Sequence, residues 1–181
     1  TIGRDYLRWS GDFAWLDKRV DGSAENGLVY QYLAKYATNC KRFKTAGGLA
    51  DYGGLNNLLE CVNTYLHEVV SLNAANVFNM RAAAEVLDLR GRQGGRDEAK
   101  KLRDEARALA SEVNKLYAPG KGYWCARFPD GSLREVRHCL DFFTVLNTMP
   151  DDLSDSQKRE MTEFFVRELK TPTWMHALSC A

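Results

Sequence analysis

One aspartate of this chain stands in a glycine-rich segment that precedes the asparagine of a predicted helix start. Asp51 lies in Gly-Gly-Leu-Ala-Asp-Tyr-Gly-Gly, residues 47–54, and Asn73 lies in Ser-Leu-Asn-Ala, residues 71–74. A carboxylic acid among apolar and aromatic neighbours can act as a general acid. A primary amide in the first turn of a helix can donate to hydroxyl groups and accept from them. Asp51 is therefore the candidate catalytic residue, and Asn73 is a candidate ligand-binding residue.

These residue types are compatible with the hydrolysis of a glycosidic bond, the reaction that the family resemblance described below implies. It requires one carboxylic acid that protonates the departing oxygen and a second carboxylate that activates water or attacks. In an inverting enzyme the two carboxyl groups lie roughly 6.5–9.5 Å apart, which leaves room for the water. Glu60 and Asp141 are the local candidates for the second carboxylate. The side chains expected to line the substrate subsite are Asn73, Glu60, Tyr52, Trp124 and Asn57.

The same residues resemble the trehalase and alpha-glucosidase clan of inverting glycosidases. In that clan an aspartate flanked by aromatic residues, on a loop, precedes a helix that opens with Asp-Leu-Asn-Ala, whereas this chain has Ser-Leu-Asn-Ala at 71–74. Gly122-Tyr123-Trp124 and the segment 171–179 resemble later parts of the clan's catalytic domain. The loop departs from the clan's usual Glu-Ser-Gly-Trp-Asp-Phe, because residues 46–52 lack the upstream glutamate and tryptophan.

The resemblance implies a six-hairpin α/α toroid, of which this chain would form about half. It implies that Asp51 is the general acid, that Asn73 contacts sugar hydroxyls, and that the substrate is an alpha-glucoside or related glycoside cleaved with inversion. In the clan the second carboxylate lies in the later half of the toroid. Either the base is supplied by sequence beyond Ala181, or this polypeptide alone is catalytically inactive. No cofactor is implied.

Simpler roles exist for each of these residues. An aspartate between glycines commonly accepts a hydrogen bond from its own turn, and an asparagine near a helix start often satisfies backbone groups. A Cys61 nucleophile with His67 as its base lacks anything that fixes an oxyanion hole. His138 and Asp141 are three residues apart on one predicted helix, a spacing that favours a local structural contact between their side chains. The three histidines are too scattered to suggest a metal site, so we expect no metal.

The composition argues against several classes of partner. Among 181 residues, 25 Lys and Arg balance 24 Asp and Glu, so no broad field favours nucleic acid or an anionic membrane. No apolar run approaches the roughly 18 residues of a membrane span, and no signal-peptide pattern opens the chain. Five scattered cysteines without a Cys-x-x-Cys pair favour a reducing compartment. We expect a soluble, cytoplasmic protein, and the resemblance to the clan implies that its partner is a carbohydrate substrate.

Hydrophobic periodicity predicts a succession of helices and one β-hairpin. The hairpin is predicted over 122–136, where Pro129-Asp130-Gly131 forms a turn sequence, and an irregular loop is predicted over 45–57. The pattern over residues 58–70 is ambiguous and is compatible with a short helix. The predicted helices are 4–9, 23–43, 71–90, 95–117, 139–147, 154–169 and the beginning of one at 174–181. Ser23 and Ser154 are the expected N-caps of two of these helices, and Gly91 is the expected stop after residue 90.

The predicted helices alternate between two kinds. The helix over 71–90 is apolar on several sides, whereas the helix over 95–117 has a single apolar stripe. Inner and outer layers would produce this alternation, so the fold class is all-α, a partial (α/α)6 toroid in one domain over 1–181. The alternative is a non-catalytic helical module. Its open inner face would bind a partner, a second copy or the missing half of the toroid.

Overall fold

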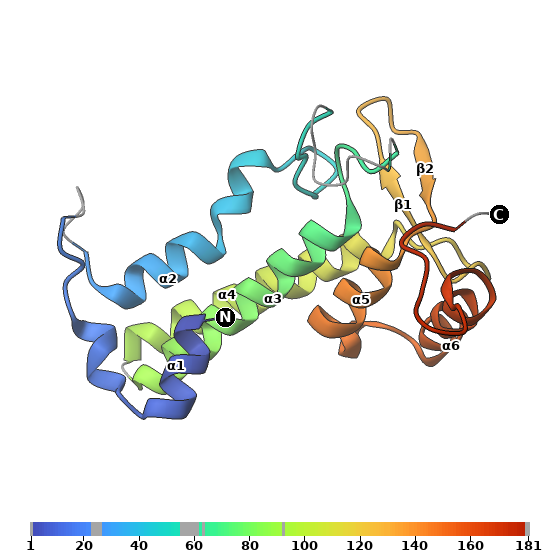
Figure 1. Ribbon diagram of the computed structural model, residues 1–181. Helices are drawn as coiled ribbons and strands as arrows, with labels where there is room; N and C mark the ends of the chain where they lie inside the picture. Colours follow the sequence, from blue (N-terminus) through green and yellow to red (C-terminus); the bar gives the residue numbers. More distant parts are fainter. Residues whose placement is uncertain (1, 23–26, 55–61, 63, 92, 180–181) are drawn as a thin grey trace. The chain divides into compact units, whose positions relative to one another are not determined.

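The computed structural model describes residues 2–22, 27–54, 62, 64–91 and 93–179 (Figure 1). This part of the chain is mostly helical and includes one small two-stranded antiparallel sheet, which confirms the predicted helical character. Among the helices described, none is both long enough and apolar enough to cross a membrane.

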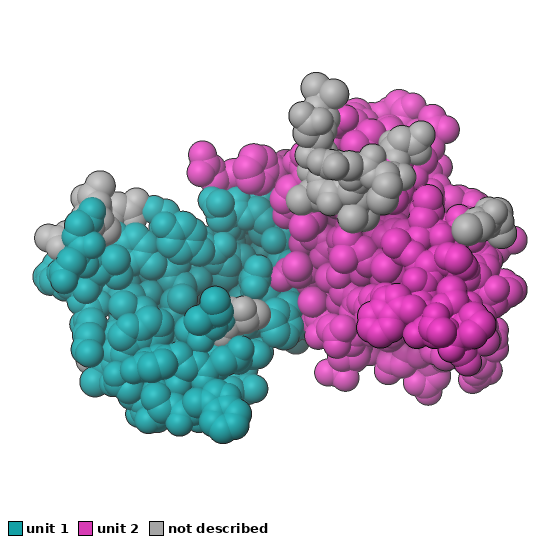
Figure 2. Space-filling model, viewed as in Figure 1, with its two compact units in different colours: residues 1–41, 76–108 teal, residues 42–75, 109–181 magenta. Residues whose placement is uncertain are grey.

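The chain divides into two compact units, which Figure 2 shows in separate colours. Unit 1 contains Thr1–Lys41 and Asn76–Ala108, and unit 2 contains Arg42–Ala75 and Leu109–Ala181. Of the three boundaries along the chain, two fall within the long helices α3 (Val70–Arg90) and α4 (Gln93–Asn114), so each of these helices contributes to both units. The single domain suggested by the sequence stays a prediction.

Unit 1 has a core built from short helical elements and the adjoining parts of α3 and α4. Leu7 and Leu16 pack with Val86 of α3 in one buried cluster. A second cluster joins Ala34 and Ala37 to residues of α3 and α4, where small side chains let the helices approach closely. The short elements are α1 (Ile2–Ser10), the 3-10 turn η1 (Phe13–Asp17) and α2 (Val29–Ala37).

The helix predicted over 23–43 is shorter in the structure. An antiparallel bridge between Arg19 and Leu28 uses the backbone just before α2, so the helix begins only at Val29. It ends at Ala37, and the chain continues as the 3-10 turn η2 (Asn39–Phe43). The predicted cap at Ser23 lies outside the described residues.

Helices α3 and α4 show the predicted contrast in burial. The consecutive residues Ala82, Ala83 and Ala84 point to different sides of α3 and are all buried, and the helix ends where Gly91 adopts a left-handed φ of 72°. On α4 the buried side chains follow one stripe that includes Leu102, Ala106 and Val113, while the acidic and basic residues on the opposite side are exposed. The α3 sequence is therefore suited to an interior position and the α4 sequence to a surface.

Unit 2 contains the predicted hairpin. Strand β1 (Trp124–Arg127) pairs antiparallel with β2 (Leu133–Val136) in a register that places Trp124 opposite Val136. The turn between them is closed by Asp130, whose Oδ1 accepts from the Ser132 amide at 2.9 Å. Val136 and most of β1 are buried, so this end of the sheet belongs to the core of the unit.

The last helices also follow the prediction, except at the end of the chain. Ser154 forms a capping box with Gln157 at the start of α6. The predicted helix over 174–181 is wrong within the described residues, because Leu178 forms an antiparallel bridge with His138 and Met175 forms one with Lys170. The elements are α5 (Cys139–Thr148), η3 (Pro150–Asp152), α6 (Asp155–Phe164) and the π turn η4 (Phe165–Leu169).

Gly122, just before β1, provides a test of the packing in unit 2. Its φ is 78°, and a Cβ at this position would collide with the carbonyl oxygen of Glu160 in α6. We expect Gly122→Ala to lower the free energy of unfolding by about 2 kcal/mol, from left-handed backbone strain plus the collision. Gly131 is the control, since its φ is 81° but nothing lies within 4 Å of the added Cβ. Urea unfolding should show that Gly131→Ala lowers the free energy of unfolding by about 1 kcal/mol. Equal losses of stability in the two variants would contradict the close approach of Gly122 to Glu160.

Candidate functional site

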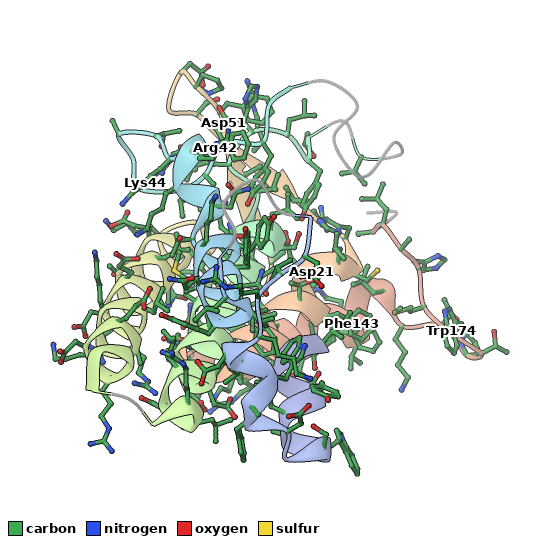
Figure 3. The ribbon with its side chains drawn as sticks, turned by 90° about the vertical axis from the view of Figure 1, so that its left-hand side faces the viewer. Asp21, Arg42, Lys44, Asp51, Phe143 and Trp174 are labelled. Atoms are coloured by element: carbon green, nitrogen blue, oxygen red, sulfur yellow. The ribbon has the colours of Figure 1, made fainter. Side chains whose placement is uncertain are left out.

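The loop that carries Asp51 is paired on both sides with other backbone segments of unit 2. The Asp51 amide donates to the Phe43 carbonyl at 2.9 Å, and the Tyr52 amide donates to the His67 carbonyl at 3.0 Å. The His67 amide in turn donates to the Gly53 carbonyl at 2.9 Å. Figure 3 labels Asp51 together with Arg42 and Lys44, the residues on either side of Phe43. These bonds fix the position of Asp51 although its loop has no regular secondary structure.

Asn73 of α3 holds the backbone directly before Asp51. Its Oδ1 accepts from the Ala50 amide at 2.9 Å, and its Nδ2 donates to the carbonyls of Ala50 and Val69 at 3.1 and 2.9 Å. The side chain is completely buried. Both of its donor hydrogens are therefore used by backbone carbonyls, which is the simpler of the two roles considered for Asn73. Direct contact of Asn73 with a sugar stays a prediction.

Replacement of Asn73 should destabilise this loop measurably. In Asn73→Ala the buried amide and carbonyl of Ala50 lose their partner, so we expect the free energy of unfolding to fall by about 2 kcal/mol. Asn79→Ala is the matched control, because Asn79 is an exposed residue of the same helix and should change stability by less than about 0.5 kcal/mol. Chemical denaturation measures both variants, and equal effects would show that the Ala50 contacts contribute nothing.

The Asp51 carboxylate has two partners and is still accessible. Its Oδ1 accepts from the Gly53 amide at 2.7 Å, which closes a local turn. The Nδ1 atom of His67 lies 3.2 Å from Oδ1 and 3.3 Å from Oδ2. The side chain of Asp51 remains 29% exposed and that of His67 21% exposed. The structure thus pairs a partly exposed carboxylate with an imidazole.

A partly buried charged cluster connects the glycine-rich loop to the hairpin. Glu68 accepts from the Thr45 hydroxyl at 2.5 Å and forms an ion pair with Arg127 at the end of β1. Arg127 also donates from Nη2 to the Gly47 carbonyl at 3.0 Å. A Cβ at Gly47 would collide with this guanidinium, and one at Gly48 would stand 2.9 Å from Glu112. The glycines therefore let the loop lie close to charged side chains.

The aromatic residues predicted to line the subsite differ in burial. Tyr52 is half-buried, and its ring centroid lies 6.1 Å from that of Phe43, which is exposed. Trp124 is only 1% exposed and packs edge-on against Tyr117. Tyr52 is therefore accessible beside Asp51, whereas Trp124 belongs to the core of unit 2 in this conformation. Glu60 and Asn57, the other predicted subsite residues, lie outside the described residues.

Asp141, a candidate for the second carboxylate, is buried and serves a structural purpose. Its Oδ1 accepts from the Ser71 amide in the first turn of α3 at 3.0 Å, and its Oδ2 lies 3.5 Å from Nε2 of His138. Both side chains are about 2% exposed, as expected for a local structural pair. Burial raises the pKa of the nearby Tyr65 hydroxyl far above its ordinary value, and the charge of Asp141 adds to this shift.

His67, Glu68 and Arg127 were missed as parts of this site by sequence analysis. His67 is sixteen positions from Asp51 in the chain, and the backbone bonds between residues 52–53 and 67 bring them together. A Glu-Val-Val sequence after His67 gives no sign that Glu68 is turned inward toward Arg127. Across the described residues, no three His, Cys, Asp or Glu side chains are grouped as a metal ion would require.

Comparison of the sequence with models of known protein families gives no match, and comparison with curated proteins gives none either. The resemblance to the trehalase and alpha-glucosidase clan therefore rests on the residues quoted for it.

Proposed function

We infer that this chain contributes a general acid, Asp51, to a glycoside hydrolase. The observation that carries this proposal is the placement of Asp51. Its backbone is held by Phe43 and by the Asn73 contacts to Ala50, yet its carboxyl group is accessible beside the exposed Phe43 and the half-buried Tyr52. A fixed carboxyl group beside aromatic rings suits the binding and protonation of a sugar.

The proposed reaction is inverting hydrolysis of an alpha-glucoside or a related glycoside. Asp51 would give its proton to the departing glycosidic oxygen, and a second carboxylate would remove a proton from the attacking water. We place that second carboxylate in the remaining half of a six-hairpin toroid, to which the alternation of buried and amphipathic helices is suited. Asn73 would hold the Asp51 loop in position for the transfer.

The stereochemistry of the product tests this function. The experiment uses the longest natural polypeptide that carries this sequence, with a panel of disaccharides in which glucose is alpha-linked. Proton NMR of the anomeric region should show beta-glucose first, since inversion of an alpha-linkage gives the beta anomer. Release of alpha-glucose as the first product would contradict inversion, and failure to release glucose from any member of the panel would contradict the substrate class.

A non-catalytic interaction module is the second candidate, because large apolar side chains are exposed in both units. In unit 1, Trp9 and Ile2 of α1 are 91% and 86% exposed. In unit 2, Trp174 is 77% exposed and points away from the chain in Figure 3. Side chains of this kind are frequent at interfaces with other proteins. Light scattering distinguishes the two candidates, since an interaction module would form an oligomer that Trp9→Ser or Trp174→Ser dissociates. A monomer with glycosidase activity would exclude it.

A further inference from the structure

We propose that His67 is a positioning residue for Asp51, holding the carboxyl group through a hydrogen bond donated from Nδ1; this inference rests on the proposed function. The contact joins two partly exposed side chains from segments that are far apart in the sequence. Nδ1 lies 3.2 and 3.3 Å from the two carboxylate oxygens. Only an imidazole with its proton on Nδ1 can donate in this direction.

The backbone of His67 supports a role for its side chain. His67 has a φ of 62°. Among the residues that the structure describes, it is the only one other than glycine with a positive φ. Such a conformation is strained for a residue with a Cβ, and glycine would adopt it more easily. In this conformation the backbone of His67 forms hydrogen bonds with Tyr52 and Gly53. A histidine at a position where glycine fits better indicates that the ring contributes something that glycine lacks.

The surroundings of the ring fix its direction. The Phe128 ring lies edge-on to the imidazole, with centroids 5.1 Å apart. A Cβ at Gly54 would stand 3.1 Å from Nε2, so the absence of a side chain at 54 leaves space beside this atom. Nδ1 is thereby directed at Asp51, and Nε2 is on the side of Gly54. In this arrangement His67 restrains the carboxyl rotamer while Asp51 itself meets the substrate.

Two replacements of His67 that have the same shape as each other, asparagine and aspartate, distinguish this role from simple packing. Asparagine and aspartate both tolerate a left-handed φ, but only asparagine presents an N–H near the position of Nδ1. We expect His67→Asn to keep most of the kcat for an alpha-linked disaccharide, and His67→Asp to lose about 10- to 100-fold in kcat with little change in KM. Circular dichroism confirms that each variant is folded. Equal kcat values for the two variants would overturn the inference.

Alpha-glucosyl fluoride is the internal control substrate, because its fluoride leaving group needs little protonation. His67→Asp should hydrolyse it almost as well as the native protein does. Loss of both activities in parallel would show a general structural defect and would overturn the positioning role. Full disaccharide activity in Asp51→Asn would instead contradict the proposed function, whatever the His67 variants do.

The tautomer of His67 provides a readout that requires no activity. In the chain with ¹⁵N-labelled histidine, two-bond proton–nitrogen correlation spectra should show a proton on Nδ1 of His67. Asp51→Ala removes the acceptor, so His67 should change to the form protonated on Nε2. If Nδ1 carries no proton in the native chain, the proposed hydrogen bond does not exist and the inference is overturned.

Discussion

Asp51→Asn should reduce kcat for alpha-linked disaccharides by roughly 10²- to 10⁴-fold, the usual contribution of a general acid. The fold should be unaffected, because the amide oxygen of asparagine can still accept from the Gly53 amide. The loss should be much smaller for alpha-glucosyl fluoride, which needs little help from an acid. Initial rates of glucose release with both substrates measure the effect.

Asp130→Asn is the matched control for this substitution. Asp130 accepts from the amide two residues later at 2.9 Å, in the same kind of turn that Asp51 forms with Gly53 at 2.7 Å. Asp130 is exposed and lies in the hairpin turn, so Asp130→Asn should leave kcat unchanged. An Asp51→Asn protein as active as the control would show that Asp51 is only a turn residue.

Arg127→Met should lower the free energy of unfolding by about 3 kcal/mol. Glu68 is 8% exposed, and removal of Arg127 leaves this carboxylate buried without its cation. The Thr45 hydroxyl remains as a hydrogen-bond donor and limits the loss. The Gly47 carbonyl also loses its bond from Arg127, so the glycine-rich loop should become more mobile. Urea unfolding measures the stability, and amide hydrogen exchange over 44–54 measures the loop.

Arg134→Met provides the comparison for Arg127. Arg134 lies on the neighbouring strand and is exposed, and its guanidinium lies 5.6 Å from the centroid of the Phe128 ring. Its replacement should therefore cost less than about 0.5 kcal/mol of unfolding free energy. In the double variant Glu68→Leu with Arg127→Met, stability should partly return because no charge is left buried. If the loss of unfolding free energy in the double variant equals the sum of the losses in the two single variants, the two residues are not coupled.

Elements defined by short-range signals were predicted well. Gly91 ends α3, Ser154 begins α6, and Pro129-Asp130-Gly131 forms the hairpin turn, because each of these signals acts within a few residues. The segment 174–179 has the apolar composition of a helix start, but its backbone pairs with residues 137–139 and 169–171 instead. Such pairing depends on the tertiary fold and leaves no local pattern.

The candidate site was predictable only in part for the same reason. Asp51 and Asn73 were identified from their positions in a loop and at a helix start, and the structure connects them through Ala50. The placement of His67 against Asp51 depends on an unusual φ and on two backbone hydrogen bonds. Neither can be predicted from the residue types in this part of the sequence. The burial of Trp124 depends on pairing with Val136 and packing against Tyr117.

Binding of an iminosugar is the most direct test of the central claim that Asp51 faces a sugar site. Amide proton–nitrogen spectra of the longest natural polypeptide should be recorded during titration with 1-deoxynojirimycin, whose ring nitrogen carries the charge that develops in glycoside hydrolysis. The account predicts saturable shifts of the Asp51, Tyr52 and Gly53 amides, which Asp51→Asn weakens and Asp130→Asn does not. Saturable shifts elsewhere that leave residues 50–53 unchanged, or no binding at all, would contradict it.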